Sequence, residues 1–331
     1  MVMMRTHAEV VKSIEGFVEE NLDLLKSVSD SWQPSDILPD MVTEGWRDKI
    51  QQLRDQARGV SDEVLIVLVG NMVTEEALPS YQTMINRHPG VQDDTGASDS
   101  PWARWTRGWT AEENRHGEIL SRYLYLSGRV DMRAVEITTQ YLIRNGFDPK
   151  TSNDPYRGLI YTSFQERATK ISHGNTAQLA NESGDPTLGQ ICALVTGDES
   201  RHEEAYKRFV GRIIETDPAG GVLAFAQMMK NTVTMPARLM SDGGTADLYA
   251  QFAVVAQRIG VYTIWDYAEI IGYLVGFWKI ADLPGLTGEA AKAQDYLGDL
   301  AQRYRGLAGR EERKPPEKAK VPFRWIFNRS V

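Results

Sequence analysis

Apolar residues recur every three or four positions along most of the chain, a spacing typical of helices that each bury one face. We therefore predict an all-α protein. Four stretches carry the pattern most strongly and should form the core of a bundle: residues 62–87, 101–127, 155–182 and 186–215. Further helices should pack around them, at about 7–28, 41–58, 131–145, 219–241, 245–259, 262–280 and 287–308.

The first core stretch begins with Val64–Val69, a run that is apolar on every side and typical of a central helix. Pro79 should kink this helix, because proline lacks the amide hydrogen that a helix interior needs. No convincing domain boundary precedes residue 310. We expect residues 1–309 to form one helical domain, and residues 310–331 to form a charged linker and a C-terminal tail or short hairpin.

Two of the core stretches carry a Glu-x-x-His motif on their apolar face. Glu113 and His116 replace apolar residues in the middle of one stripe, and Glu199 and His202 do so in another. Because positions i and i+3 lie on the same side of a helix, each motif presents a carboxylate and an imidazole to one point in space. One copy is weak evidence for a metal site, since a pair of surface residues also fits it. Two copies on buried faces are strong evidence.

The other two core stretches each offer an inward carboxylate. One is Glu166, and the other is Glu75 or Glu76, between which the periodicity does not decide. A Glu from each of two helices and a Glu-x-x-His from each of two others is the ligand pattern of dinuclear carboxylate bundles. Carboxylates that were merely packed would each cost several kcal/mol, whereas two divalent cations would balance their charge. Oxygen and imidazole ligands without thiolate favour iron or manganese.

Composition narrows the possible functions. The 331-residue chain has a net charge of −8, which argues against a general nucleic-acid or anionic-membrane binder. Its single cysteine, Cys192, excludes a disulfide or a cysteine-rich metal site within one chain. No apolar run reaches the roughly 18 residues of a membrane span, and the N-terminus lacks the apolar region of a secretory signal. We expect an intracellular protein that is not integral to a membrane.

Several long motifs resemble the soluble stearoyl-type acyl-acyl-carrier-protein desaturases, a branch of the ferritin-like di-iron family. They cover nearly the whole chain and include Thr74–Pro79, Trp109–Gly117, Tyr123–Met132, Phe164–Thr169, Ser172–Thr176, Val254–Arg258, Lys292–Tyr296 and Pro322–Phe327. The resemblance implies a ferritin-like di-iron four-helix bundle with additional helices. It also implies a homodimer that uses O2 and two electrons from reduced ferredoxin. With these it would place a cis double bond, at the delta-9 position, in a saturated acyl chain on acyl carrier protein.

The same resemblance assigns roles to single residues. It implies two irons per chain, bound by Glu75, Glu113, His116, Glu166, Glu199 and His202. It places Thr169 on the oxygen-binding side of the metals, although a helix threonine can equally bond back to a backbone carbonyl. It also implies that Trp32, Asp198 and His116 carry electrons inward, although a tryptophan near the surface can equally serve packing. The compartment would be the cytoplasm of a bacterium or, for a trimmed plant-type protein, the plastid stroma.

One segment departs from the plant enzymes of this family, which carry smaller or apolar residues where this chain has Arg87 and His88. Met84 and Arg87 follow Glu75 by nine and twelve positions, which is about 13–18 Å along a helix and close to the depth of an acyl methyl end. We expect Met84, Arg87 and His88 to contribute to the substrate pocket. Arg87 would either point to solvent or close the pocket.

Other ferritin-like di-iron proteins are the alternatives. An iron-storage or ferroxidase bundle needs a shorter chain and none of the tail motifs. A radical-generating ribonucleotide reductase subunit needs a tyrosine close to the metals, and Tyr123 and Tyr206 lie on suitable faces. A rubrerythrin-like peroxidase would bring a cysteine-rich iron site, which a single cysteine excludes.

Overall fold

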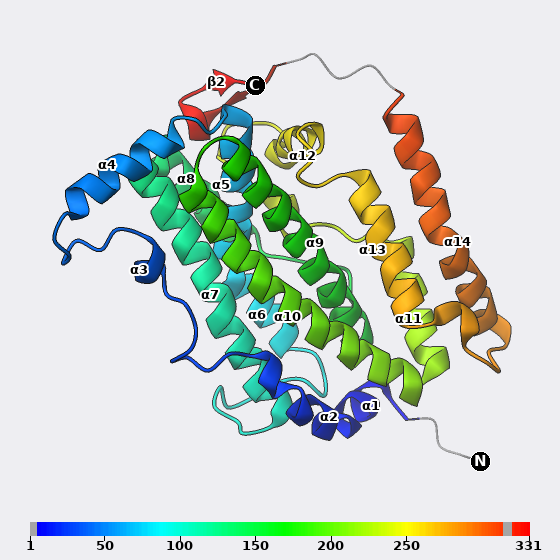
Figure 1. Cartoon of the computed structure of the whole chain (residues 1–331). Coiled ribbons are helices and arrows are strands. Elements are labelled where there is room, and N and C mark those ends of the chain that lie inside the picture. Colours follow the sequence, from blue (N-terminus) through cyan, green and yellow to red (C-terminus); the bar gives the residue numbers. More distant parts are fainter. Residues whose placement is uncertain (1–4, 314–319) are drawn as a thin grey trace.

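The computed structural model describes residues 5–313 and 320–331, and most of these residues are helical (Figure 1). Four helices form the centre of the fold: α5 (Asp62–Glu76), α7 (Pro101–Ser127), α9 (Pro155–Glu182) and α10 (Pro186–Thr216). The bounds predicted for α7 and α9 are confirmed, and α10 extends one residue beyond the prediction. The all-α bundle predicted from the periodicity is therefore confirmed.

Polar caps and prolines explain why three of these helices begin where they do. The side chains of Ser100, Asp154 and Asp185 each accept a hydrogen bond from a backbone amide in the first turn of α7, α9 and α10. Each cap is followed directly by a proline, whose fixed φ and missing amide hydrogen suit the first helical position. The starts of the long helices are thus encoded locally, which is why the sequence pattern located them.

The first core stretch is divided into two helices. Helix α5 ends at Glu76, and α6 (Leu78–Asn86) follows after Ala77, with Pro79 in its first turn. The effect expected of Pro79 is therefore a break between two helices rather than a kink within one. The part of α5 from Val64 to Val73 is buried on every side, as the apolar run predicted.

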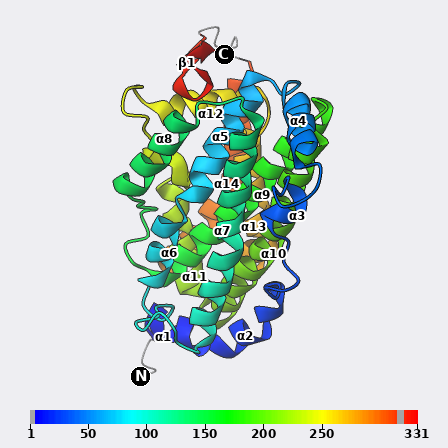
Figure 2. The same ribbon diagram turned by 90° about the vertical axis from the view of Figure 1, so that its left-hand side faces the viewer.

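Further helices surround the centre: α1 (His7–Ser13), α2 (Glu15–Glu20), α3 (Pro34–Ile37), α4 (Trp46–Ala57), α8 (Met132–Asn145), α11 (Pro218–Lys230), α12 (Leu248–Arg258), α13 (Ile264–Phe277) and α14 (Gly288–Glu311). Helices α13 and α14 pack on each other, with α13 against α9 and α14 against α11. Helix α12 packs on α5. Helices α1 and α2 lie at one end of the bundle and the C-terminal hairpin lies at the other (Figure 1, Figure 2).

Two predicted helices are shorter than expected. The stretch 7–28 is divided at Ile14 and Asn21 into α1, α2 and the 3-10 turn η1 (Leu22–Leu24). The stretch 219–241 is helical only as far as Lys230. Thr232 then adopts a left-handed conformation with φ of 55°, and the 3-10 turn η2 (Pro236–Leu239) follows. The apolar spacing continues through these breaks, so periodicity could not reveal them.

The C-terminal segment forms the short hairpin that was expected. Strands β1 (Pro322–Phe323) and β2 (Arg329–Ser330) pair antiparallel around the 3-10 turn η4 (Arg324–Ile326). Trp325 is buried, and its indole nitrogen donates a hydrogen bond to Thr138 of α8 at 2.9 Å. The predicted charged linker falls largely on residues 314–319, which lie outside the described residues, and α14 reaches Glu311.

Candidate metal centre

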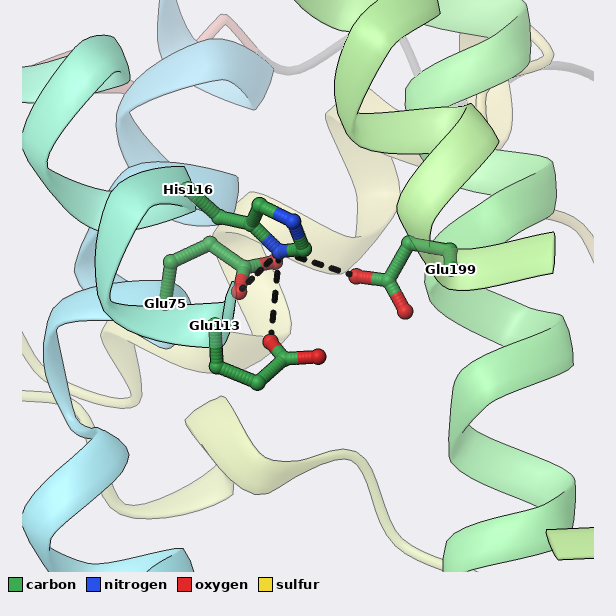
Figure 3. A group of neighbouring side chains, drawn as sticks. All are labelled: Glu75, Glu113, His116 and Glu199. Atoms are coloured by element: carbon green, nitrogen blue, oxygen red, sulfur yellow. Dashed lines mark ion pairs between the residues drawn. The ribbon is translucent and has the colours of Figure 1, made fainter. Parts of the chain in front are cut away.

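The four central helices bring the six predicted ligands together. Glu75 comes from α5, Glu113 and His116 from α7, Glu166 from α9, and Glu199 and His202 from α10. They form two overlapping groups, each suited in composition and spacing to hold a metal ion. Figure 3 shows the first group, Glu75, Glu113, His116 and Glu199, and the second consists of Glu113, Glu166, Glu199 and His202. Glu113 and Glu199 belong to both groups, so they stand where carboxylates could bridge two metals.

Glu113 directs one oxygen to each histidine. Its Oε2 lies 3.2 Å from Nδ1 of His116, and its Oε1 lies 2.7 Å from Nδ1 of His202. The other carboxylates approach the same imidazole nitrogens at longer range. Glu199 and Glu75 lie 3.6 and 3.9 Å from His116, and Glu166 lies 3.6 Å from His202. All six side chains are buried.

Unpartnered atoms indicate that this cluster is built for cations. Nδ1 of both histidines, Oε1 of Glu113 and Oε1 of Glu199 find no hydrogen-bond partner of acceptable geometry within residues 5–313 and 320–331. Leaving several such atoms buried and unsatisfied is costly. Carboxylate oxygens and imidazole nitrogens that converge without competing hydrogen bonds are suitable ligands for divalent iron or manganese. The residues present therefore fit a dinuclear metal centre.

A second layer of carboxylates fixes the orientation of the two imidazoles. Nε2 of His116 lies 3.4 Å from Oδ2 of Asp198, and Nε2 of His202 lies 3.1 Å from Oε2 of Glu112. Each carboxylate accepts the Nε2 proton, so the lone pair of Nδ1 faces the cluster. Asp198 also accepts a hydrogen bond from the indole of Trp32 at 3.0 Å. The ring of Trp32 stacks on that of His116 with centroids 6.2 Å apart.

Three residues of this layer, Glu112, Arg115 and Arg201, were not predicted from the sequence. The two motifs extend over five positions rather than four: Glu112–His116 and Asp198–His202 both read acid, Glu, any residue, Arg, His. Arg115 donates to Asp198 at 3.1 Å, and Arg201 donates to Glu112 at 2.6 Å. The outer carboxylate of each motif thus binds the His and the Arg of the other. The repeated Arg was a signal that could have revealed this arrangement.

Glu75 and Glu166, which each belong to only one of the two groups, also form hydrogen bonds with residues outside the cluster. Nε2 of His173 lies 2.9 Å from Oε1 of Glu75, and the indole nitrogen of Trp109 donates to Oε1 of Glu166 at 3.0 Å. In both residues the second oxygen faces a histidine of the cluster. Both partners lie on the apolar stripes of their helices in the sequence, but spacing alone did not distinguish them from packing residues.

The pKa values of the cluster are strongly perturbed. Burial raises the pKa of Glu75 and, by more, that of Glu166. Burial also acts to raise the pKa of Glu113, but His116 and His202 outweigh it and lower that pKa. The pKa values of both histidines are raised well above the usual range, because nearby carboxylates outweigh the opposing effect of burial. Protons and metal ions would therefore compete for the same groups.

Two cavities meet beside the cluster. The outer cavity has a volume of about 500 Å³ and extends from Glu75 to Tyr304 and Arg238, between α5, α9, α12 and α13. The inner cavity, of about 60 Å³, reaches Met84, Phe147 and other largely apolar residues. Thr74, Glu75 and Thr169 line both cavities. A linear molecule occupying both would therefore pass the Glu75 side of the cluster.

Thr169 lines this junction, but its hydroxyl is engaged elsewhere. Oγ1 donates to the backbone carbonyls of Gln165 and Glu166, both at 3.1 Å. The bond to a helix carbonyl, which sequence analysis left open, is thus present. The role of Thr169 beside the metals remains a prediction.

The three residues expected at the substrate pocket lie in different places. Met84 lines the inner cavity as expected, but Arg87 and His88 do not. Arg87 follows the end of α6, is exposed and lines surface depressions. His88 is buried outside the cavity, with Nε2 3.3 Å from Oγ1 of Thr151. Helix α6 ends at Asn86, so Arg87 lies at the end of the helix and His88 lies beyond it.

The structure also shows where the alternative candidates lie that the sequence offered for a metal ligand and for a tyrosine near the metals. Glu76 is half-buried and belongs to neither metal group, whereas Glu75 belongs to one. Tyr123 donates its hydroxyl proton to Asp185, away from the cluster. Tyr206 packs edge-on against Trp109, with ring centroids 6.1 Å apart.

Comparison with known protein families decides the family. The model of the family described as "Fatty acid desaturase" matches residues 6–327. The chain belongs to this family. No helix in the described ranges has the length and apolar character needed to cross a membrane.

Relatives of this desaturase family member are found in plants. It is 57% identical over 324 residues to a chloroplastic acyl-[acyl-carrier-protein] desaturase of Cucumis sativus, an alignment that covers 98% of this chain and 82% of the relative. It is 56% identical to a chloroplastic stearoyl-[acyl-carrier-protein] 9-desaturase of Brassica napus, over 98% of this chain and 81% of that protein.

A solved structure supports the fold. The X-ray structure of DesA2 from Mycobacterium tuberculosis H37Rv, a proposed acyl-ACP desaturase, covers 83% of this chain and 97% of its own, with a TM-score of 0.53 and 18% identity. At this level of identity, the likeness shows the fold alone.

Proposed function

We propose that the chain is an acyl-[acyl-carrier-protein] desaturase that introduces a cis double bond, at the delta-9 position, into a saturated acyl chain. The observation that carries this proposal is the position of Glu75 and Thr169 at the junction of the two cavities. An acyl chain that entered the outer cavity and ended in the inner one would present its middle carbons to the cluster. The stearoyl 9-desaturases among the plant relatives support the same reaction.

Iron is the metal we propose, as two ions per chain held by Glu75, Glu113, His116, Glu166, Glu199 and His202. With O2 they would supply the oxidising power needed to remove hydrogen from an unactivated CH2–CH2 unit. The balanced reaction is R–CH2–CH2–R′ + O2 + 2 e⁻ + 2 H⁺ → R–CH=CH–R′ + 2 H2O. The chain positions the acyl group and limits the access of water, which would otherwise permit side reactions.

The external partners follow from this reaction. The chain has no cysteine pair and a single buried cysteine, so we propose that reduced ferredoxin supplies the electrons. Half-buried Trp32, which contacts Asp198 and stacks on His116, offers a route from the surface. The acyl chain would arrive on acyl carrier protein near the exposed Arg238 at the outer cavity. We further propose a homodimer that works in a bacterial cytoplasm or a plastid stroma.

A reconstituted assay tests the proposal. Purified protein loaded with Fe²⁺ is given stearoyl-carrier protein, ferredoxin, a ferredoxin reductase and NADPH, and products are separated by gas chromatography. We expect a cis-9 product and two irons per chain. Iron-loaded protein that leaves the saturated chain unchanged, or that converts free fatty acid without a donor, would contradict the proposal.

A matched pair of variants tests the ligand set. Glu199 and Glu203 are both buried glutamates on α10, one turn apart, but Glu203 pairs with Arg167 and Lys170 at 2.6 and 3.0 Å. Glu199→Gln should lose bound iron, and Glu203→Gln should retain it. Equal iron contents in the two variants would remove Glu199 from the ligand set.

A further inference from the structure

The wall of the outer cavity contains a cluster of polar residues that are not among the proposed metal ligands. Asn71, Ser172 and His173 line this cavity beside Glu75, among largely apolar and aromatic neighbours. The hydroxyl of Ser172 donates to Oδ1 of Asn71 at 3.2 Å. Nδ2 of Asn71 and Nδ1 of His173 find no hydrogen-bond partner in the described part of the chain, although the two side chains are only 9% and 1% exposed.

The chemistry of these two atoms is complementary. Because Oδ1 of Asn71 is occupied by Ser172, the amide offers its N–H groups as donors. Nε2 of His173 lies 2.9 Å from Oε1 of Glu75, and the carboxylate accepts the proton carried by that nitrogen. With Nε2 donating to this carboxylate, Nδ1 offers a lone pair. The wall presents one donor and one acceptor, which the methylene groups of an acyl chain cannot satisfy.

A buried polar group without a hydrogen-bond partner is destabilising, so two such groups in one wall indicate that a partner of another kind binds there. A buried water molecule usually makes about three hydrogen bonds and can donate and accept at the same time. A third atom of this kind lines the same cavity: the hydroxyl of Tyr262, also buried and without a partner among the described residues. The polar atoms thus lie in the wall of a space that an acyl chain must share.

We propose that Asn71 and His173 form a water-binding site in the wall of the outer cavity, which keeps its water beside the bound acyl chain. If the function proposed above is correct, this water provides a polar exit for the two water molecules formed with each double bond. The methylene groups of the bound acyl chain itself offer these water molecules no hydrogen bonds. The site itself depends only on the protein and does not require turnover.

The test combines a structure with a measurement of coupling. High-resolution crystal structures of the iron-loaded protein are determined with and without a saturated acyl thioester. The variants Asn71→Leu, which removes the donor at similar size, and Tyr249→Phe, which removes a hydroxyl elsewhere in the same cavity, are treated alike. We expect a water within hydrogen-bond distance of both Asn71 and His173 in the wild type and in Tyr249→Phe. It should persist with the thioester bound and be absent from Asn71→Leu.

Absence of this water in the wild type, its displacement by the acyl chain, or its retention in Asn71→Leu would overturn the proposal. Oxygen consumption and double-bond formation are then compared. Asn71→Leu should consume more O2 per double bond than Tyr249→Phe, and equal ratios would refute the exit role. A wild type that binds the water but makes no double bond would refute the proposed function and leave the site intact. A wild type that makes the double bond but binds no water at this position would support the proposed function and refute the water-binding site.

Discussion

The length of the acyl chain should be set by Met84 together with Phe147. Both residues line the inner cavity, and both also line a depression on the outer surface. They therefore separate the end of the inner cavity from that depression. Met84 is buried at 4% exposure in the second half of α6. Met84→Ala should deepen the cavity without altering any residue of the metal cluster.

The expected size of the effect follows from the atoms removed. The substitution takes away three heavy atoms of the side chain, which makes room for about two methylene groups. Each buried methylene contributes about 0.8 kcal/mol, so two contribute about 1.6 kcal/mol, or roughly a 15-fold change in relative kcat/KM. Partial collapse of the cavity would reduce this value. The same substitution should lower the free energy of unfolding by about 2–5 kcal/mol.

The assay compares kcat/KM for two acyl-carrier substrates that differ by two carbons, such as C16 and C18, by gas chromatography of the products. Arg87→Thr is the matched control, because Arg87 is exposed and lies outside the inner cavity. Met84→Ala should shift the ratio toward the longer chain, and Arg87→Thr should leave it within about twofold. A folded Met84→Ala protein with an unchanged ratio, or an equal shift in Arg87→Thr, would refute this reasoning.

Three further predictions concern the cluster and the hairpin. Trp109→Phe removes the hydrogen bond to Glu166 and should weaken metal binding about 10- to 100-fold in a Co²⁺ titration; an unchanged affinity would show that this bond does not position the ligand. Because the pKa values of the cluster histidines are raised, protons compete with metal, so Co²⁺ affinity should fall as the pH is lowered and binding should release protons into a weakly buffered solution. Arg329 of the hairpin donates to Asp62 at the start of α5, and this hydrogen bond lowers the pKa of Asp62. The ion pair therefore stabilises the fold at pH values above the usual carboxyl pKa, and this stabilisation is lost as the pH falls through the lowered pKa. Asp62→Asn should therefore reduce the free energy of unfolding by less than about 1 kcal/mol at neutral pH and by nothing in strong acid, whereas a loss that persists in acid would assign the effect to packing.

Local signals explain what could be predicted from the sequence. Apolar periodicity located the long helices, and the caps at Ser100, Asp154 and Asp185, each followed by proline, make their starts a local property of the sequence. The doubled Glu-x-x-His pattern on buried stripes identified residues that the structure brings together, because helix geometry fixes which side chains share a face. Neither inference needed knowledge of how the helices pack.

The remaining features depend on tertiary contacts. Whether Trp109 and His173 serve packing or hold a ligand is decided by where α7 and α9 lie relative to Glu166 and Glu75. The orientation of His88 was inaccessible for a similar reason: its ring packs over Gly158 of α9, where a Cβ atom would lie 2.6 Å from the imidazole. A sequence pattern shows which face of a helix is buried, but it does not show which atom lies opposite.

The crossed second layer links the site to the register of the bundle. Glu112 on α7 binds His202 and Arg201 on α10, while Asp198 on α10 binds His116 and Arg115 on α7. A shift of one helix by a turn, about 5.4 Å, would separate all of these pairs at once, and Asp198 would keep only partners outside α7, such as Arg201 on its own helix. Removing one partner of a buried ion pair costs about 3–5 kcal/mol, so such a shift would be strongly unfavourable even before any metal is bound. The contacts that orient the imidazoles therefore also select the alignment of the helices that carry them.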